Sequence, residues 1–185
     1  KMDRKMFRKT ARFGNDHIFF IWLAFFIPWL LLYPVKLLGS KLVFSKIRAK
    51  LGNAFKGGVS GGGALPPAID NFFWTVGVNL VEGYGLTETA PVIGVRPMYK
   101  PVFGTVGSPI RNVEVRIVDD NGNILPAGKK GEVQVRVGIV MREYYKRDDL
   151  TAKVIDKEGW FSTGDIGMLT VNNEIVLRGR KKDTI

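Results

Sequence analysis

The chain has 185 residues, 45% of them hydrophobic, with no cysteine and a single histidine, His17. This length can bury the core of one domain or of two small ones, and so much apolar content excludes a disordered tail. The absence of cysteine excludes a disulfide scaffold or a thiolate metal site, and one histidine argues against a zinc site or a Ser-His-Asp hydrolase. The sequence begins with Lys1 rather than Met, which indicates a piece of a longer protein.

The net charge of +11 is concentrated at the amino-terminal end. Residues 1–56 carry 12 Lys and Arg against two acids, a net +10, whereas residues 57–185 are nearly neutral at +1. A nucleic-acid-binding protein would combine such charge with a recognisable reader motif, and the sequence has none. We therefore expect no nucleic-acid partner.

The basic end also contains an uncharged apolar run of 18 residues, Ile18 to Val35, with cations on both sides. Its length just reaches that of a membrane-spanning helix, but Pro28 and Pro34 interrupt it, and no small-residue cleavage site follows it as in a signal peptide. Three interpretations stay open: a helix covered by the rest of a larger protein or by a partner, a helix on an anionic membrane surface, and a true span. Residues 1–39 are thus a basic and apolar arm, with membrane-surface contact through residues 1–38 as one alternative.

Helical and strand patterns alternate over residues 40–101, as is typical of an α/β sheet. The expected elements are a helix from a capping Ser40 to Gly52, a strand at 55–60, a helix from Pro66 to Gly77 and a short strand at 78–81.

The pattern changes after residue 101 to the period-two alternation of antiparallel strands. The expected elements are strands at 113–118, 131–137, 168–170 and 174–177, turns at 119–123 and 172–173, and a short helix at 149–155 capped by Asp148. The fold class is therefore α/β, with a partial α/β sheet layer followed by a small antiparallel, distorted barrel-like unit at 102–178.

Two glycine-containing segments are candidate ligand sites. Gly61–Gly63 follows the first expected strand, where the lack of Cβ atoms lets a ligand contact the backbone, although glycine-rich turns more often serve only the turn. Residues 122–130 resemble a phosphate loop, but no Ser or Thr follows the lysine and the segment lies between two strands. We therefore exclude a phosphate loop there.

The segment Tyr84–Thr89, YGLTET, places an aromatic ring, hydroxyls and a carboxylate just after the strand at 78–81. These groups can stack a base, bond a phosphate and hold Mg²⁺, and open α/β sheets bind ligands at the carboxyl ends of their strands. The alternative is a turn with a capping threonine and a solvated glutamate. The local pattern does not decide between them.

Asp165 follows a glycine at the expected entrance of a strand, where its carboxylate can accept hydrogen bonds from both hydroxyls of a ribose. A turn-forming aspartate is the equal alternative. The basic segment Arg178–Asp183 is by itself typical of a solvated linker.

Six segments together resemble the adenylate-forming superfamily, and specifically its AMP-forming long-chain acyl-CoA synthetases. They are SGGGALPP (60–67), EGYGLTETAP (82–91), GTVGSP (104–109), GEVQVR (131–136), GWFSTGD (159–165) and LRGRKKD (177–183). The resemblance covers about residues 40–185 and implies a fragment from the later part of that family's large N-terminal domain. On this basis 40–101 is the α/β part of the AMP-binding domain, 102–178 its β-rich subdomain and 179–185 the hinge to a C-terminal domain that the sequence lacks.

The resemblance also implies a ligase reaction in two halves. A fatty acid carboxylate attacks the α-phosphate of ATP to give acyl-AMP and pyrophosphate, and coenzyme A then displaces AMP to give acyl-CoA. It thus implies fatty acid, ATP and coenzyme A as substrates and Mg²⁺ as the metal, and we expect a cytoplasmic location with peripheral membrane contact as the alternative. For the adenine, the resemblance implies Gly62 and Gly63 beside the ring, Tyr84 stacked on it, and Glu82 and Gly85 along its edge and the acyl tunnel. For the phosphates, it implies Thr87 on the α-phosphate and Glu88 on Mg²⁺. Asp165 and Arg180 would bind the ribose, and Lys182 would lie at the hinge.

The sequence departs from the family in two respects. It lacks the Ser/Thr/Gly-rich phosphate loop and the terminal-domain lysine, so we expect no ligase activity from this chain alone. It also has Arg142–Glu143 where the family usually has a glycine before the aromatic pair, which puts that loop's conformation in doubt. The alternative function is a membrane-surface or partner-binding module that uses the basic and apolar arm.

Overall fold

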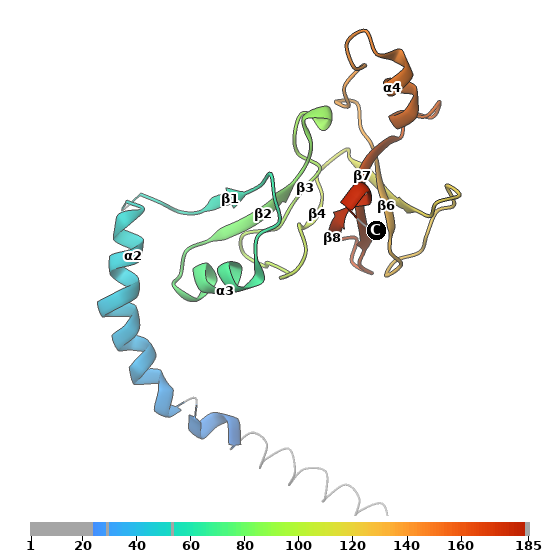
Figure 1. The fold of residues 1–185 in the computed structure, drawn as a ribbon. Helices are drawn as coiled ribbons and strands as arrows, with labels where there is room; N and C mark the ends of the chain where they lie inside the picture. The colour runs from blue at the N-terminus through green and yellow to red at the C-terminus, as the bar shows by residue number, and fades with distance from the viewer. Residues whose placement is uncertain (1–23, 29, 53, 184–185) are drawn as a thin grey trace, which may run out of the picture. The chain divides into compact units, whose positions relative to one another are not determined.

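The computed structural model describes residues 24–28, 30–52 and 54–183, and the chain divides into two compact units, residues 1–54 and 55–185 (Figure 1). Most of the predicted basic arm, residues 1–23, lies outside the described residues.

The first unit contains one long helix, Ala24–Lys50, which includes a π-helical turn, η1 (Ser40–Phe44), and the final α2 (Ser45–Lys50). The expected interruption at Pro28 and Pro34 is wrong, because both residues are helical. The helix ends before Gly52 as predicted, since that residue has a φ of +92°. The predicted cap at Ser40 is wrong, because the preceding Gly39 already has helical backbone angles and the helix runs through both. By length and composition alone, this is the one helix among the described residues that is long and apolar enough to cross a membrane.

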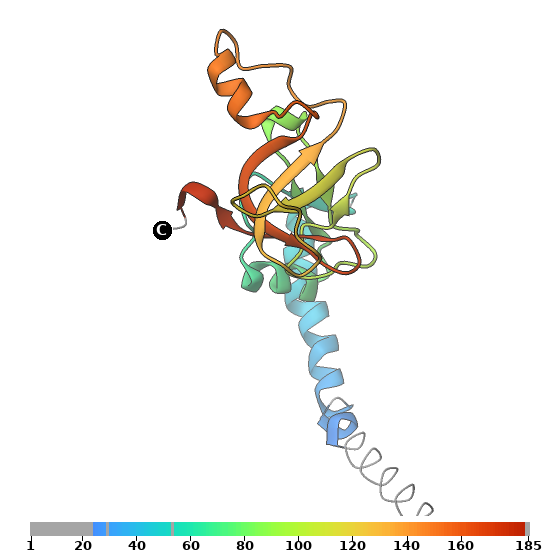
Figure 2. The ribbon, with the colours of Figure 1, turned by 90° about the vertical axis from the view of Figure 1, so that its right-hand side faces the viewer.

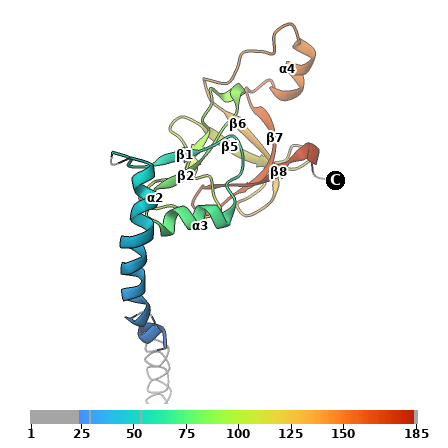
Figure 3. The same ribbon diagram turned by 60° about the vertical axis from the view of Figure 1, so that its left-hand side comes forward.

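The second unit begins with a four-stranded sheet in the order β1 (Gly58–Ser60), β2 (Leu80–Tyr84), β3 (Gly94–Val95) and β4 (Ser108–Pro109). β1 and β2 are parallel, and the other pairs are antiparallel. The connection from β1 to β2 contains α3 (Pro67–Thr75), which starts one residue after the predicted Pro66 and packs against β2 (Figure 3). The two-residue strands β3 and β4 were not predicted, because so short a pairing leaves no alternation in the sequence.

A buried ion pair fixes α3 to this sheet. Both carboxylate oxygens of Asp70 accept hydrogen bonds from the guanidinium of Arg96, at 2.6 and 2.7 Å, and a third bond of 3.3 Å goes to the carbonyl of Leu80. Asp70 and Arg96 are 5% and 1% exposed. Such a two-pronged pair gives the helix a defined position on the sheet.

The second sheet is an antiparallel meander of β5 (Glu114–Val118), β6 (Gly131–Arg136), β7 (Phe161–Leu169) and β8 (Ile175–Arg180) (Figure 2). The predicted α/β class and the antiparallel unit are confirmed, but this sheet is open rather than a closed barrel, since among the described strands the pairing stops at β5 and β8. Four strands are too few to close around a filled interior.

The link from β6 to β7 carries α4 (Asp148–Val154), close to the predicted helix. Its cap is Arg147 rather than Asp148, because Arg147 has the non-helical φ of −133° and Asp148 is already the first helical residue. Differences of one residue at helix ends are common.

One core joins the two sheets of the second unit. It contains Tyr84 and Ile93 from the first sheet region and Ile117, Val133 and Ile175 from the second. As a result, the carboxyl end of β2 lies against β7 and β8.

Candidate functional site

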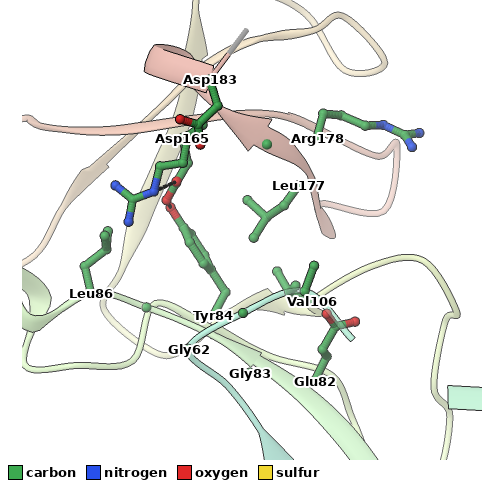
Figure 4. Close-up of a pocket in the computed structure, with 15 residues that line it drawn as sticks. Gly62, Glu82, Gly83, Tyr84, Leu86, Val106, Asp165, Leu177, Arg178 and Asp183 are labelled. Carbon is green, nitrogen blue, oxygen red and sulfur yellow. Dashed lines mark hydrogen bonds and ion pairs between the residues drawn. The ribbon is translucent and has the colours of Figure 1, made fainter. Parts of the chain in front are cut away.

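Three side chains from three strands meet where β2 ends (Figure 4). The phenol of Tyr84 donates a 2.7 Å hydrogen bond to Oδ2 of Asp165 on β7, and Oδ1 of the same carboxylate lies 3.0 Å from Nε of Arg180 on β8. The side chain of Arg178 points away from this group in Figure 4. Residues separated by 81 positions in the sequence are thus in direct contact.

Local features of β7 explain how Asp165 reaches Tyr84. The predicted strand entrance at Asp165 is wrong: the strand begins at Phe161, and Asp165 is its fifth residue, paired with Arg180. The pairing of β6 with β7 is irregular just before it, and Gly164 there has a φ of +71°, which favours glycine. The hydroxyl of Thr163 donates to the carbonyl of Val133 and accepts the N–H of Asp165, which holds this irregular segment in place.

The Tyr84 side chain is only 7% exposed. Burial, reinforced by the hydrogen bond to Asp165, raises the pKa of Tyr84 well above its ordinary value. The phenol therefore remains a neutral hydrogen-bond donor at physiological pH.

A cavity of about 570 Å³ adjoins the Tyr84–Asp165 pair. Gly62 in its wall has a φ of +80°, and a Cβ atom on Gly85 would lie 1.5 Å from the carbonyl oxygen of Pro91, so both positions require glycine. Oε1 of Glu82 accepts a 2.9 Å hydrogen bond from the N–H of Leu65 and so fixes the glycine segment to β2. The cavity is lined by residues 62–64, 82–86, 106, 165, 177–180 and 183.

A second cavity of about 610 Å³ adjoins the first, since Gly62, Gly85, Leu86 and Arg180 line both. It is more polar in character, with the carboxylates of Glu88 and Glu132, the cations of Lys153 and Arg180, and the hydroxyls of Thr87, Tyr144, Ser162 and Thr163 among its lining residues.

Glu88 of this second cavity lies in a short 3-10 turn, η2 (Thr87–Thr89), which follows β2 after Gly85 and Leu86. Its Oε1 accepts a 2.9 Å hydrogen bond from the phenol of Tyr144, and its carbonyl accepts one of 2.7 Å from the N–H of Met141. Thr89 is fully buried, and its hydroxyl both accepts from the N–H of Leu86 and donates to the carbonyl of that residue. Thr89 therefore fixes the turn, while Thr87 lies on its exposed side.

The residues around Glu88 fit a magnesium ion that is carried by a phosphate ligand. Among the described residues, no cluster of three or more Asp, Glu, His or Cys side chains could cage a metal. Mg²⁺ is usually held by one or two carboxylates together with substrate phosphates and water. A single restrained carboxylate beside a polar cavity matches that pattern.

The structure brings most of the predicted site residues together. Gly62, Gly63, Glu82, Tyr84, Gly85, Asp165 and Arg180 line the first cavity, and Thr87 and Glu88 line the second. Lys182 lines neither of them; it lies in η3 (Lys181–Asp183), whose Lys181 forms ion pairs with Glu132 and Asp120 at 2.9 and 3.3 Å. The roles of all these residues stay predictions.

The sequence reasoning assigned no site role to several polar residues of the second cavity, among them Tyr144 and Lys153. The aromatic pair Tyr144–Tyr145 was noticed, but nothing in its pattern tells which ring turns inward. Lys153 belongs to a short charged helix whose cations look alike in the sequence.

The end of β2 is surrounded by two sheets, a glycine segment and polar groups. This arrangement is typical of a nucleotide-binding site, and comparison with known proteins gives the same class. Residues 16–145 match the family described as AMP-binding enzyme, and the chain belongs to this family.

Three relatives illustrate which members of the family the chain is similar to. The chain is 47% identical over 175 residues to the probable acyl-activating enzyme 16, chloroplastic, and 41% identical over 183 residues to the long-chain-fatty-acid–[acyl-carrier-protein] ligase AEE15, chloroplastic, both of Arabidopsis thaliana. It is 34% identical over 158 residues to the long-chain-fatty-acid–CoA ligase FadD15 of Mycobacterium bovis. These matches cover 85–89% of this chain but only 24–25% of the relatives, so the chain spans about a quarter of their length.

Solved structures show the same fold. ATP-bound MatB from Rhodopseudomonas palustris matches 69% of this chain and 26% of its own with a TM-score of 0.65 and 28% identity. The anthranilate CoA ligase AuaEII in complex with anthranoyl-AMP matches 69% of this chain and 25% of its own with a TM-score of 0.63 and 26% identity.

Proposed function

We propose that this chain supplies the adenine-nucleotide site of an ATP-dependent long-chain fatty acid ligase. The observation that carries the proposal is the hydrogen bond between Tyr84 and Asp165 at the edge of a cavity walled by the glycine segment. The relatives that are named long-chain fatty acid ligases support the substrate class.

The first cavity takes the adenosine part of the nucleotide. An ionised carboxylate offers about four acceptor positions, so Asp165 can bond Tyr84 and Arg180 and still accept both hydroxyls of a ribose. Gly62 and Gly63 let the adenine approach the backbone, with the ring of Tyr84 against its face and Glu82 and Gly85 at its edge.

The second cavity takes the phosphates. Thr87 donates its hydroxyl to the α-phosphate, and Lys153 adds a cation to the same cavity. Glu88 would hold Mg²⁺, which when bound neutralises charge that develops on the phosphate oxygens. Groups fixed in advance in this way lower the barrier to attack by the fatty acid carboxylate, because they need no rearrangement as the charge develops.

The remaining parts of the reaction belong to the whole protein. Acyl-AMP and pyrophosphate form first, and coenzyme A then displaces AMP; Lys182 marks the hinge about which a further domain would move between these steps. The chain contains neither the phosphate loop nor the terminal lysine of that family, so by itself it binds nucleotide without ligase activity.

A second candidate concerns the acceptor of the acyl group. The relative at 41% identity is named an acyl-carrier-protein ligase, whereas the relative at 34% is named a CoA ligase. An acyl-carrier protein in place of coenzyme A is therefore the alternative thiol for this site.

The helix Ala24–Lys50 and the cations around it support contact of the whole protein with an anionic membrane surface, because such a surface attracts both apolar and basic side chains. The corresponding location of the whole protein is the cytoplasm, with peripheral contact to the membrane.

The test is the equilibrium affinity of the chain for AMP. Asp165→Asn keeps the side-chain shape but removes the charge that accepts the ribose hydroxyls, and we expect affinity to fall at least about tenfold. Glu158→Gln, the same change at an exposed position, is the control and should bind AMP like the parent chain. Equal affinities for AMP in all three chains would refute the assignment of Asp165.

A further inference from the structure

We propose that Tyr144 is a positioning residue that holds the Glu88 carboxylate ready for a divalent cation. The inference rests on the proposed function, which places the nucleotide phosphates in the second cavity. It assigns a role to a loop that sequence patterns leave undefined.

The loop from Met141 to Tyr144 is attached directly to η2. The phenol of Tyr144 donates to Oε1 of Glu88 at 2.9 Å, and the N–H of Met141 donates to the Glu88 carbonyl at 2.7 Å. One loop therefore restrains both the side chain and the backbone of Glu88.

The same loop is also attached to α4. The N–H of Tyr144 donates a 3.0 Å hydrogen bond to the hydroxyl of Thr151, and that hydroxyl donates to the carbonyl of Arg147. Thr151 is in the helix that carries Lys153 into the cavity. Tyr144 thus has a fixed backbone from which its phenol reaches Glu88.

The geometry leaves the carboxylate suitable for a metal. A phenol that bonds Oε1 uses one of its acceptor positions, and among the contacts of the described residues Oε2 accepts no hydrogen bond. A hydrogen-bonded partner of a metal ligand fixes the ligand's orientation, and its loss typically costs about 10- to 100-fold in metal affinity. Tyr144 is placed to act in this way through Glu88.

The adjacent Tyr145 provides a matched control. It is 80% exposed, and its ring lies 5.1 Å from the ammonium of Lys146 rather than in the cavity. Tyr145→Phe removes an equivalent phenolic hydroxyl from the next residue in the chain and leaves the contacts of Glu88 unchanged.

The experiment measures the affinity of the chain for ATP with and without Mg²⁺, together with its affinity for AMP in the absence of metal. For Tyr144→Phe we expect the gain in ATP affinity on adding Mg²⁺ to shrink about tenfold, with metal-free AMP affinity and the thermal unfolding midpoint unchanged. Tyr145→Phe should retain the full magnesium effect.

Combining Tyr144→Phe with Glu88→Gln separates positioning from a general structural role. Once Glu88→Gln has removed the metal ligand, the additional Tyr144→Phe change should alter the magnesium effect no further. An unaltered magnesium effect in Tyr144→Phe, an equal loss of metal-free AMP affinity, or additive effects in the double variant would each overturn the inference. If the parent chain binds neither AMP nor ATP, the proposed function fails and this inference fails with it.

Discussion

Tyr84 is the central residue of the site. Its buried phenol joins the two sheets through the hydrogen bond to Asp165. In the folded chain its proton is held to a higher pH than in the unfolded chain. Its contribution to stability is therefore fully present below about pH 10 and is lost as the pH rises above that value.

Tyr84→Phe tests this directly. Above about pH 10 the free energy of unfolding of the parent chain should fall more steeply than that of the variant, by up to about 1.4 kcal/mol per pH unit. Denaturant unfolding at pH values from neutral to alkaline measures both slopes. Parallel pH dependences in the two chains would contradict the buried hydrogen bond.

Single residues also show the limit of sequence reasoning. The motif around Tyr84 and the aspartate at 165 could be recognised only through a combined resemblance, because each local pattern also fitted an ordinary turn. Their contact depends on an irregular pairing at Gly164, and no alternation of apolar residues encodes such a feature. The inward direction of Tyr144 depends likewise on packing against η2 and α4.

Among the elements, α4 contributes a side chain to the candidate site that could not be predicted from its sequence pattern. This seven-residue helix carries Lys153 into the wall of the second cavity, although its sequence pattern is that of an ordinary exposed helix.

Lys153→Met keeps the length of the side chain and removes its charge. We expect the affinity for ATP to fall about two- to fivefold while the affinity for AMP changes little, since the proposed function puts the phosphates in the second cavity and ATP carries more phosphate charge than AMP. Lys157→Met, just beyond the helix, is the control. Titration of each variant with both nucleotides gives the ratio, and equal losses for ATP and AMP would exclude a role on the phosphate side.

Elements with a clear repeating pattern were predicted well. α3, β5 and β6 have strong apolar periodicity or turn residues, and the structure contains them near the expected bounds. β2 and β8 each end three residues later than predicted, and β7, predicted only at 168–170, already begins at Phe161. The cap at Ser40 failed because the helix runs through Gly39 and Ser40, and β3 and β4 were missed because they are held by neighbours rather than by their own pattern.

For the molecule as a whole, one core joins the α/β sheet to the antiparallel meander in the second unit. That joining brings the carboxyl end of β2 against β7 and β8 and creates two adjoining cavities. Under the proposed function, the second unit is a preformed nucleotide site.

The most direct measurement is an amide chemical-shift titration of the chain with AMP. We predict that the shifts concentrate on Gly62, Gly85, Asp165 and Arg180, which surround the first cavity, and leave the exposed Val171 unmoved. Shifts that gather elsewhere, with Gly62 and Asp165 unaffected by saturating AMP, would contradict this prediction.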